Sequence, residues 1–196
     1  TSVTDAGVAG GWIGHSPREI AAYQEAKLLT RMQLMPTIDV LHDLEGHTSE
    51  KTAFGIDTGL RTGFGNERLQ IGPTKIFTDG SLLGTTAAMS EDYQCCSHHG
   101  YFQGDVKVMK SQALKAASLG WSLALHAIGD AAVEFAIEVI TEATSRYGQP
   151  SMPHRIEHGG VVQDSQIKKI AESGIILVPQ PRFIREFGDS MAAKIG

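Results

Sequence analysis

Cysteine is nearly absent from this 196-residue chain, and the two that occur, Cys95 and Cys96, are neighbours. Adjacent cysteines rarely form a disulfide with each other, and two cysteines cannot build a disulfide framework. The sequence offers no second cysteine pair for a tetrahedral metal site, so free thiols are the better interpretation. We therefore expect a reducing, cytoplasmic compartment for the protein.

The sequence also lacks long apolar runs and basic blocks. No stretch approaches the roughly 20 apolar residues of a membrane-spanning helix, and no basic segment precedes an apolar core as in a secretory signal. The formal net charge is −5. This balance argues against nucleic acid or an anionic membrane as the main partner.

The remaining composition is that of an ordinary globular protein, 41% hydrophobic and 20% charged. This length supports one sizeable core, so we expect a single domain over residues 1–196. The first residue is Thr1, and the segment to Gly7 is typical of a strand end and the loop after it. We therefore expect a piece of a longer protein.

Apolar runs and helical periodicities alternate along the chain. After the partial first strand, we expect strands at Met35–Leu41, Leu69–Thr78, Ser122–Leu125, His154–Glu157 and Ile175–Val178. We expect helices at about 17–32, 105–119, 131–147 and 164–173, and a short helix and a turn over 49–66. Residues 81–104 form a long loop, and the tail after Arg182 is helix or loop.

Strict alternation of strand and helix predicts an α/β fold with a parallel sheet and right-handed crossovers. No Gly-x-Gly-x-x-Gly follows the first strand, which disfavours dinucleotide binding. No glycine-rich anion loop follows the last strands, which disfavours a phosphate-binding barrel enzyme. A (β/α) barrel, or part of one, is the better prediction.

Three polar residues occupy matching positions at consecutive strands: Lys75, His126 and His158. The carboxyl ends of barrel strands meet at one mouth, where two imidazoles would suit zinc or a similar metal. Each histidine alone is more often a hydrogen-bonded core residue, and Lys75 alone would pair with Asp79 or Glu157. Lysine would bind a metal only as its anionic carbamate.

Other polar residues have weaker claims on this mouth. His98 and His99 lie in the long loop, where a solvated position is favoured over substrate contact. Asp130 caps the following helix or supports His126, and the two roles are compatible. Glu157 has Arg155 or a neighbouring strand as its partner. His42 and His47 lie in the polar loop after the second strand, and we do not favour a position for them in the lining of the pocket.

Three segments, Lys75–Ser81, His126–Asp130 and Arg155–His158, resemble the amidohydrolase superfamily. The narrower likeness is to the amidohydrolase-3 branch, with the N-substituted formamide deformylases and proteins described as exoenzyme regulatory. It implies a (β/α)8 TIM barrel that hydrolyses amide or other nonpeptide C–N bonds of small molecules through metal-activated water. It implies one or two divalent metals, usually zinc, with a carboxylated Lys75 and with His126 and His158 as ligands. The resemblance further implies that Asp79, Asp130, Arg155 and Glu157 support the metal ligands from behind or lie on the substrate side.

Two features of that family are missing from this sequence. There is no His-x-His pair, and Asp189 follows no apolar run that could be the last barrel strand. The sequence therefore predicts a partial barrel, roughly strands two to seven, with no identifiable catalytic aspartate and no activity of its own. We expect its open edges to favour a homo-oligomer. The alternative is a noncatalytic binding or regulatory protein on the same barrel.

Overall fold

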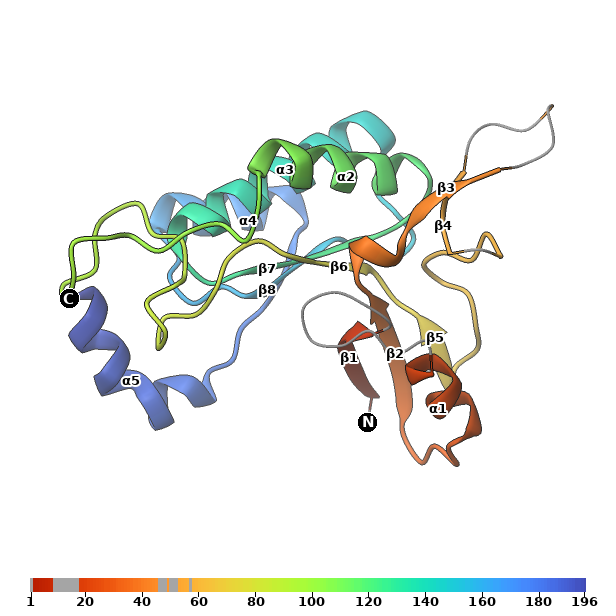
Figure 1. The fold of residues 1–196 in the computed structure, drawn as a ribbon, viewed down its shortest axis with the longest axis horizontal. Helices are drawn as coiled ribbons and strands as arrows, with labels where there is room; N and C mark the ends of the chain where they lie inside the picture. Colours follow the sequence, from red (N-terminus) through yellow and green to blue (C-terminus); the bar gives the residue numbers. More distant parts are fainter. Residues whose placement is uncertain (1, 9–17, 46–48, 50–52, 57) are drawn as a thin grey trace.

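The computed structural model describes residues 2–8, 18–45, 49, 53–56 and 58–196. They form two sheets, each made of parallel strands, and a small antiparallel hairpin (Figure 1). The first sheet has the order β1-β2-β5 and the second the order β6-β7-β8-β9. The strands of the first sheet are β1 (Ser2–Val8), β2 (Arg31–Pro36) and β5 (Leu69–Ile71). Those of the second sheet are β6 (Thr74–Phe77), β7 (Leu123–Ala127), β8 (Arg155–His158) and β9 (Ile176–Val178).

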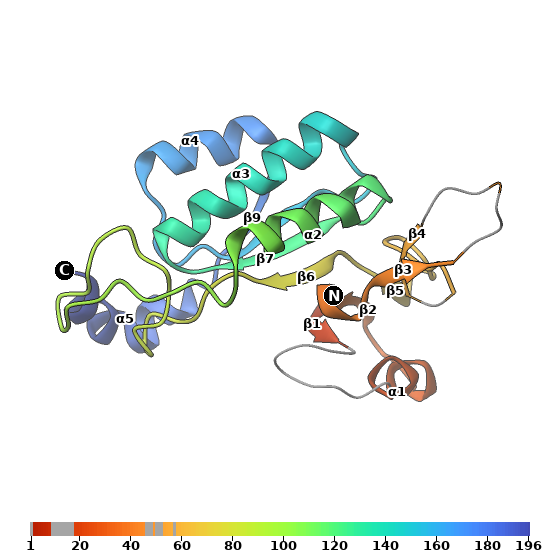
Figure 2. The ribbon, with the colours of Figure 1, turned by 45° about the horizontal axis from the view of Figure 1, so that its top comes forward.

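Three helices cover one face of the second sheet (Figure 2). They are α2 (Val106–Ser118), α3 (Asp130–Tyr147) and α4 (Asp164–Ser173), and each connects two neighbouring parallel strands. The shorter α1 (Glu19–Glu25) lies beside the first sheet, and α5 (Arg182–Ile195) follows β9. The expected α/β class, with parallel strands alternating with helices, is therefore confirmed for the second sheet.

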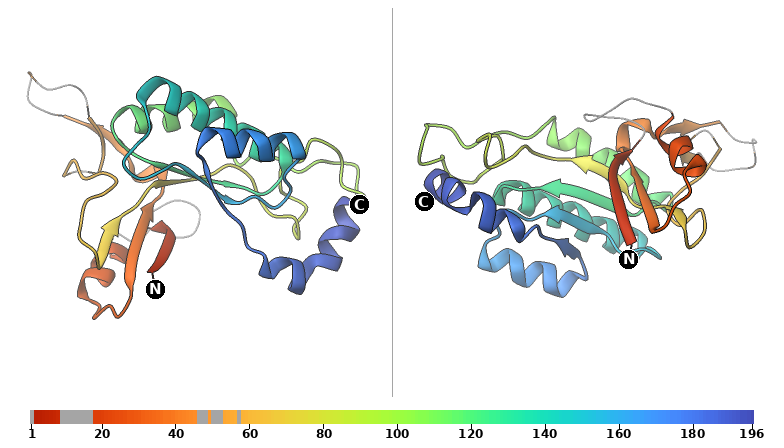
Figure 3. Two further views of the ribbon diagram at one scale, coloured as in Figure 1. Left: turned by 180° about the vertical axis from the view of Figure 1, so that it is seen from behind. Right: turned by 90° about the horizontal axis from the view of Figure 1, so that it is seen from below.

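The core lies between this sheet and its helices. Leu123, Leu125 and Ile156 are fully buried on the covered face of the sheet. Ala132 and Ala136 of α3 are equally buried, and their small side chains let the helix lie close to the strands. Within the described residues, none of the helices α2, α3 and α4 lies on the opposite face (Figure 3).

One expected strand is two strands. Leu69–Thr78 breaks at Gly72 and Pro73, so β5 pairs with β2 while β6 pairs with β7. Pro73 has no amide hydrogen for a ladder, and a Cβ on Gly72 would come 2.7 Å from Cγ of Gln33. A single parallel bridge, Thr37 to Lys75, connects the two sheets across this break.

The other corrections fall in the first third of the chain. The helix expected over 17–32 ends at Glu25, because Ala26 is extended and Arg31–Pro36 is already a strand. The strand expected to reach Leu41 ends at Pro36, and η1 (Ile38–Val40) is a 3-10 turn. In place of the helix expected in 49–66, β4 (Ala53–Gly55) pairs antiparallel with β3 (His42–Leu44). The alternation is therefore not strict before β6. The expected capping residues Ser16 and Pro17 lie outside the described residues.

The long segment between β6 and α2 is ordered without a helix or strand, and all of its residues are described. A bridge between Asp79 and Phe102 joins the two ends of this segment. In its middle, the Gln94 amide donates to the Lys194 carbonyl of α5 at 2.8 Å. The loop and α5 therefore lie together beyond the carboxyl ends of the strands (Figure 1). None of the described helices is both long enough and apolar enough to cross a membrane.

Candidate metal centre

The register of the second sheet puts Lys75, His126 and Glu157 on its uncovered face. His158 pairs with Ala127, one position further along, where β8 ends. Phe77, His126 and Glu157 are paired across β6, β7 and β8. Lys75 pairs with Ala124, two positions nearer the amino ends of the strands. Side chains at paired positions of parallel strands point to the same face, so the lysine and His126 share one face at different depths.

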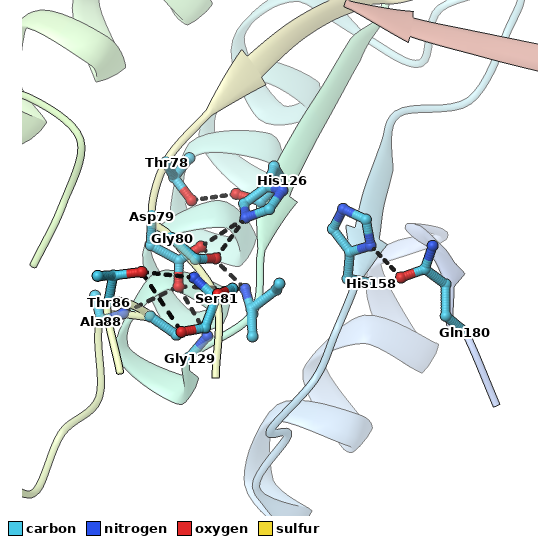
Figure 4. Close-up of polar contacts among 12 residues, drawn as sticks. Thr78, Asp79, Gly80, Ser81, Thr86, Ala88, His126, Gly129, His158 and Gln180 are labelled. Carbon is cyan, nitrogen blue, oxygen red and sulfur yellow. Dashed lines mark hydrogen bonds and ion pairs between the residues drawn. The ribbon is translucent and has the colours of Figure 1, made fainter. Parts of the chain in front are cut away.

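His126 is the last residue but one of the fully buried strand β7 and is held by the segment that follows β6. Its Nε2–H donates to the carbonyl oxygen of Gly80 at 2.9 Å, and the hydroxyl of Thr78 donates to the His126 carbonyl (Figure 4). No hydrogen bond of Nδ1 occurs among the described residues. The ring therefore has one fixed N–H and one free lone pair, which is the tautomer a ligating histidine needs.

His158 reaches the same place from the end of β8. Its backbone has a φ of 75°, a left-handed conformation that non-glycine residues rarely adopt. Its Nδ1 donates to Oε1 of Gln180 at 2.8 Å, which leaves Nε2 free (Figure 4). The rings of His126 and His158 are 4.6 Å apart between centroids, with planes at 70°. The strained backbone thus directs the second imidazole toward the first.

Both imidazoles are neutral at pH 7. Burial lowers the pKa of His126 to about 4, against the raising effect of the Gly80 carbonyl. Burial also lowers the pKa of His158, against the raising effect of its hydrogen bond to the Gln180 side-chain oxygen. Neutral imidazole is the form that coordinates a metal, so no proton has to be displaced from these ligands.

Lys75 is 2% exposed and faces Phe77, with Nζ 5.1 Å from the ring centroid. Burial lowers the pKa of its amine to about 8, and the Glu157 carboxylate only partly offsets this. Neither Asp79 nor Glu157 forms an ion pair with Lys75 among the described contacts. Glu157 instead pairs with Arg155, whose Nη2 donates to Oε2 at 3.1 Å. The buried ion pair considered for Lys75 is therefore not found.

Asp79 organises the turns around His126. Its carboxylate is fully buried and accepts the backbone amides of Ala88, Ile128 and Gly129, the last at 2.8 Å. Its Oδ1 lies 3.4 Å from Nε2 of His126. Burial raises the pKa of Asp79 to about 6 in spite of the three amides. Asp79 thus has the position of a residue that supports His126.

Asp130 was the alternative support for His126, and the structure places it elsewhere. It lies in the first turn of α3 and accepts hydrogen bonds from the amide and hydroxyl of Ser90 and from Nε2 of Gln163. No contact joins it to His126 among the described residues, and Gly129 rather than Asp130 is the N-cap. Asp130 therefore connects the long loop with the amino ends of α3 and α4.

The other candidate side chains lie outside this cluster. His98 and His99 are exposed, and His99 pairs with the exposed Asp92. Cys95 and Cys96 are free thiols. His42 is exposed on β3 of the hairpin, and His47 lies outside the described residues.

Sequence reasoning missed the groups that hold the two imidazoles. Gln180 lies between Pro179 and Pro181 just after β9, so a polar residue at a fourth strand end was the available signal. The Gly80 carbonyl is a backbone group and left no signal of its own. His154, also missed, is buried and accepts the Leu123 amide at 3.0 Å, which is a core role.

The side chains of this site supply some, but not all, of the ligands that a divalent metal needs. Two neutral imidazoles with free nitrogens are suitable zinc ligands. Within the described part of the chain, however, no group of three or more His, Cys, Asp or Glu side chains is arranged to hold an ion. The site described here can supply two ligands and needs others to complete a coordination shell.

The amidohydrolase family model matches residues 1–195. This chain belongs to the amidohydrolase family. The expected resemblance is confirmed by curated members as well. The chain is 33% identical over 117 residues to putative amidohydrolase YtcJ of Bacillus subtilis, covering 59% of the chain and 22% of that protein. It is 27% identical over 121 residues to the N-substituted formamide deformylase of Arthrobacter pascens, covering 62% of the chain and 22% of that protein.

Solved structures support the same family. An uncharacterized metal-dependent hydrolase from Pyrococcus horikoshii superimposes with a TM-score of 0.69 at 31% identity, over 90% of this chain and 32% of that one. One from Pyrococcus furiosus gives a TM-score of 0.70 at 26% identity, over 90% of this chain and 34% of that one. This amidohydrolase chain thus spans about a third of the solved hydrolases and less than a quarter of the curated relatives, which is consistent with a partial barrel.

Proposed function

We propose that this chain supplies part of the active site of a metal-dependent hydrolase that cleaves amide or other nonpeptide C–N bonds of small molecules. The observation that supports this most is the pair of neutral imidazoles, His126 and His158, with ring centroids 4.6 Å apart. Relatives described as amidohydrolase, deformylase and metal-dependent hydrolase support the reaction class. We propose zinc as the metal, because two nitrogen ligands suit it.

In this proposal His126 and His158 hold the metal through their free nitrogens. A bound metal lowers the pKa of a water ligand to about 7 and polarises a carbonyl oxygen. The Gly80 carbonyl and Gln180 keep each ring in the ligating tautomer. Asp79 is the positioning residue, because it connects the turns on either side of His126.

Lys75 is proposed as the second source of ligand atoms. The low pKa of its amine makes the neutral form accessible near pH 7. The neutral nitrogen adds to the carbon of carbon dioxide and loses a proton, giving a carbamate anion with two oxygen donors. A second metal would require further ligands, so we propose that residues 1–196 alone hydrolyse amides poorly or not at all.

The test compares metal binding with hydrolysis. We expect the chain to bind Co²⁺ weakly, with visible absorption that His126→Ala or His158→Ala abolishes and that the exposed-loop control His99→Ala retains. We expect amide hydrolysis only from a protein in which this chain is joined to the remaining barrel strands. Co²⁺ spectra that are unchanged in both site variants would contradict the proposal.

The second candidate is a noncatalytic binding or regulatory protein on the same barrel. It is favoured by the absence of a three-ligand cluster within the described residues. Hydrolysis by the extended protein distinguishes the two candidates. Activity that is lost in His126→Ala supports the enzyme, and an extended, folded protein without activity supports the binding protein.

A further inference from the structure

A cavity of about 330 Å³ lies against His158 at the carboxyl ends of the strands. Its walls come from the start of the long loop, the turn after β7, the end of β8, the segment after β9 and α5. These segments are far apart in the sequence, and they meet where the candidate metal centre opens.

The cavity is lined by apolar groups and contains no formal charge. The apolar side chains include Leu82, Leu83, Ile128, Phe183 and Met191, and none of the described Asp, Glu, Lys or Arg residues lines it. Its polar groups are His158, Gln180 and Ser81. A charged ligand group would lose its hydration there without gaining a partner, so the lining selects for an uncharged, apolar group.

The wall is formed by packed side chains. Leu82 is 4% exposed, and Ile128 and Met191 pack against it in the same small cluster. A Cβ on Gly160 would come 2.8 Å from Cγ2 of Ile128, so only glycine lets the backbone approach this wall. The cavity therefore exists before a ligand arrives, which reduces the ordering cost of binding.

A second cavity on the molecule provides a contrast. It has a volume of about 720 Å³ and is lined by Arg31, Glu67 and Arg155 among other polar residues. Arg155 is at the amino end of β8, whereas His158 is at its carboxyl end. Of these two cavities, the smaller and uncharged one is lined by His158.

We propose that this cavity binds the apolar substituent of a neutral amide, with the amide group itself placed at His158. This specificity rests on the proposed function, because it assumes that the reacting bond lies at the two imidazoles. The volume is at the lower end of the range of about 300–1,000 Å³ for ligand sites, so a substituent of about one ring fills it.

The test measures amide binding to the chain without metal, so that it does not depend on coordination or hydrolysis. Chemical shift changes are followed by NMR during titration with N-cyclohexylacetamide and, separately, with N-(2-hydroxyethyl)acetamide. We expect the cyclohexyl amide to bind at least about tenfold more tightly, with shifts concentrated at Leu82, Ile128 and His158. Equal affinity for the two amides, or shifts elsewhere, would overturn the proposal.

A second test places a carboxylate at the cavity wall and compares it with the same change made elsewhere. Leu83→Asp changes a side chain that is 41% exposed, and the control Leu29→Asp makes the same change at a leucine that is 87% exposed and lines no part of this cavity. We expect Leu83→Asp to weaken binding of the cyclohexyl amide about tenfold and Leu29→Asp to leave it unchanged. If Leu83→Asp fails to fold, Ile184→Asp at a 76% exposed lining residue gives the same test. Undiminished binding in the folded variant would refute the cavity as the site, whatever the metal experiments give.

Discussion

Asp79 is a buried carboxylate that is surrounded by backbone amides, with no lysine or arginine paired to it among the described residues. Three amides from two separate turns donate to its two oxygens. Burial nevertheless raises its pKa to about 6, which means that the amides only partly replace the lost hydration. Near neutral pH the ionised, buried carboxylate therefore lowers the free energy of unfolding, although its hydrogen bonds hold the turns beside His126.

Replacing Asp79 by alanine leaves these amide donors without an acceptor. Each unsatisfied buried donor costs about 1–3 kcal/mol, so we expect the free energy of unfolding to fall by roughly 3 kcal/mol. Urea unfolding at pH 7 measures this. The control Asp92→Ala removes an exposed carboxylate and should cost less than about 1 kcal/mol. Equal losses in the two variants would disprove the anchoring role.

His154 provides a pH-dependent measure of the core. Burial lowers the pKa of His154 to about 4, whereas the unfolded chain binds that proton near pH 6.5. The unfolded state therefore gains protons first, and the contribution of His154 to stability is complete above about pH 6.5 and is lost as the pH falls toward 4. A shift of this size corresponds to about 3 kcal/mol.

The matched variant is His154→Asn, whose side-chain oxygen can still accept the Leu123 amide. We expect it to lose less stability than the parent between pH 7 and pH 4.5 in urea unfolding. His126 acts in the same direction and Asp79 in the opposite direction, but both are present in the two proteins and cancel in the comparison. Parallel pH profiles would contradict the proposed titration of His154.

The sequence predicted the candidate ligands because each has a local signature. Lys75, His126 and His158 follow or interrupt apolar runs in consecutive units, so they needed only the rule that strand ends meet. Gly80 and Gln180 act on rings that are 46 and 22 positions away, and two of the three amides that Asp79 accepts are 49 and 50 positions away. Their roles depend on how the turns pack against one another, and the spacing of apolar residues in the sequence does not predict that packing.

At the scale of the element, α4 separates buried from exposed positions within one turn. Ile170 is 8% exposed and belongs to the main core, whereas Ile167 is 53% exposed. We expect Ile170→Ala to lower the free energy of unfolding by about 2–4 kcal/mol and Ile167→Ala by less than about 1 kcal/mol. Thermal or urea unfolding of the two variants checks this. A larger loss for Ile167→Ala would show that α4 faces the sheet differently.

The elements were predicted best where they are long. Helices α3 and α4 match the expected ranges closely, because many periodic residues and clear end signals define them. The strands β3 and β4 were not expected, and β5 was not separated from β6; these three strands have three residues each, too few for a period to emerge. Their pairing is decided by tertiary contacts, such as the fit of Gly72 against Gln33, which sequence patterns do not reveal.

At the scale of the molecule, each sheet formed by the described residues has edge strands that pair on one side only. Strand β9 ends the second sheet and exposes 45% of Ile176, and β1 ends the first. We expect self-association through such an edge, seen as a concentration-dependent dimer in sedimentation equilibrium. Ile176→Lys should weaken that dimer, because a charge at an edge opposes pairing. A parent chain that stays monomeric at all concentrations would contradict this.

The carboxylate of Asp79 has a consequence for how the molecule opens. The amides of Ala88, Ile128 and Gly129 belong to the long loop and to the turn that starts α3, yet they share one acceptor. Breaking that junction exposes all three to solvent at once. Their hydrogens should therefore exchange with deuterium at one common opening free energy, so the loop and the start of α3 form one cooperative unit.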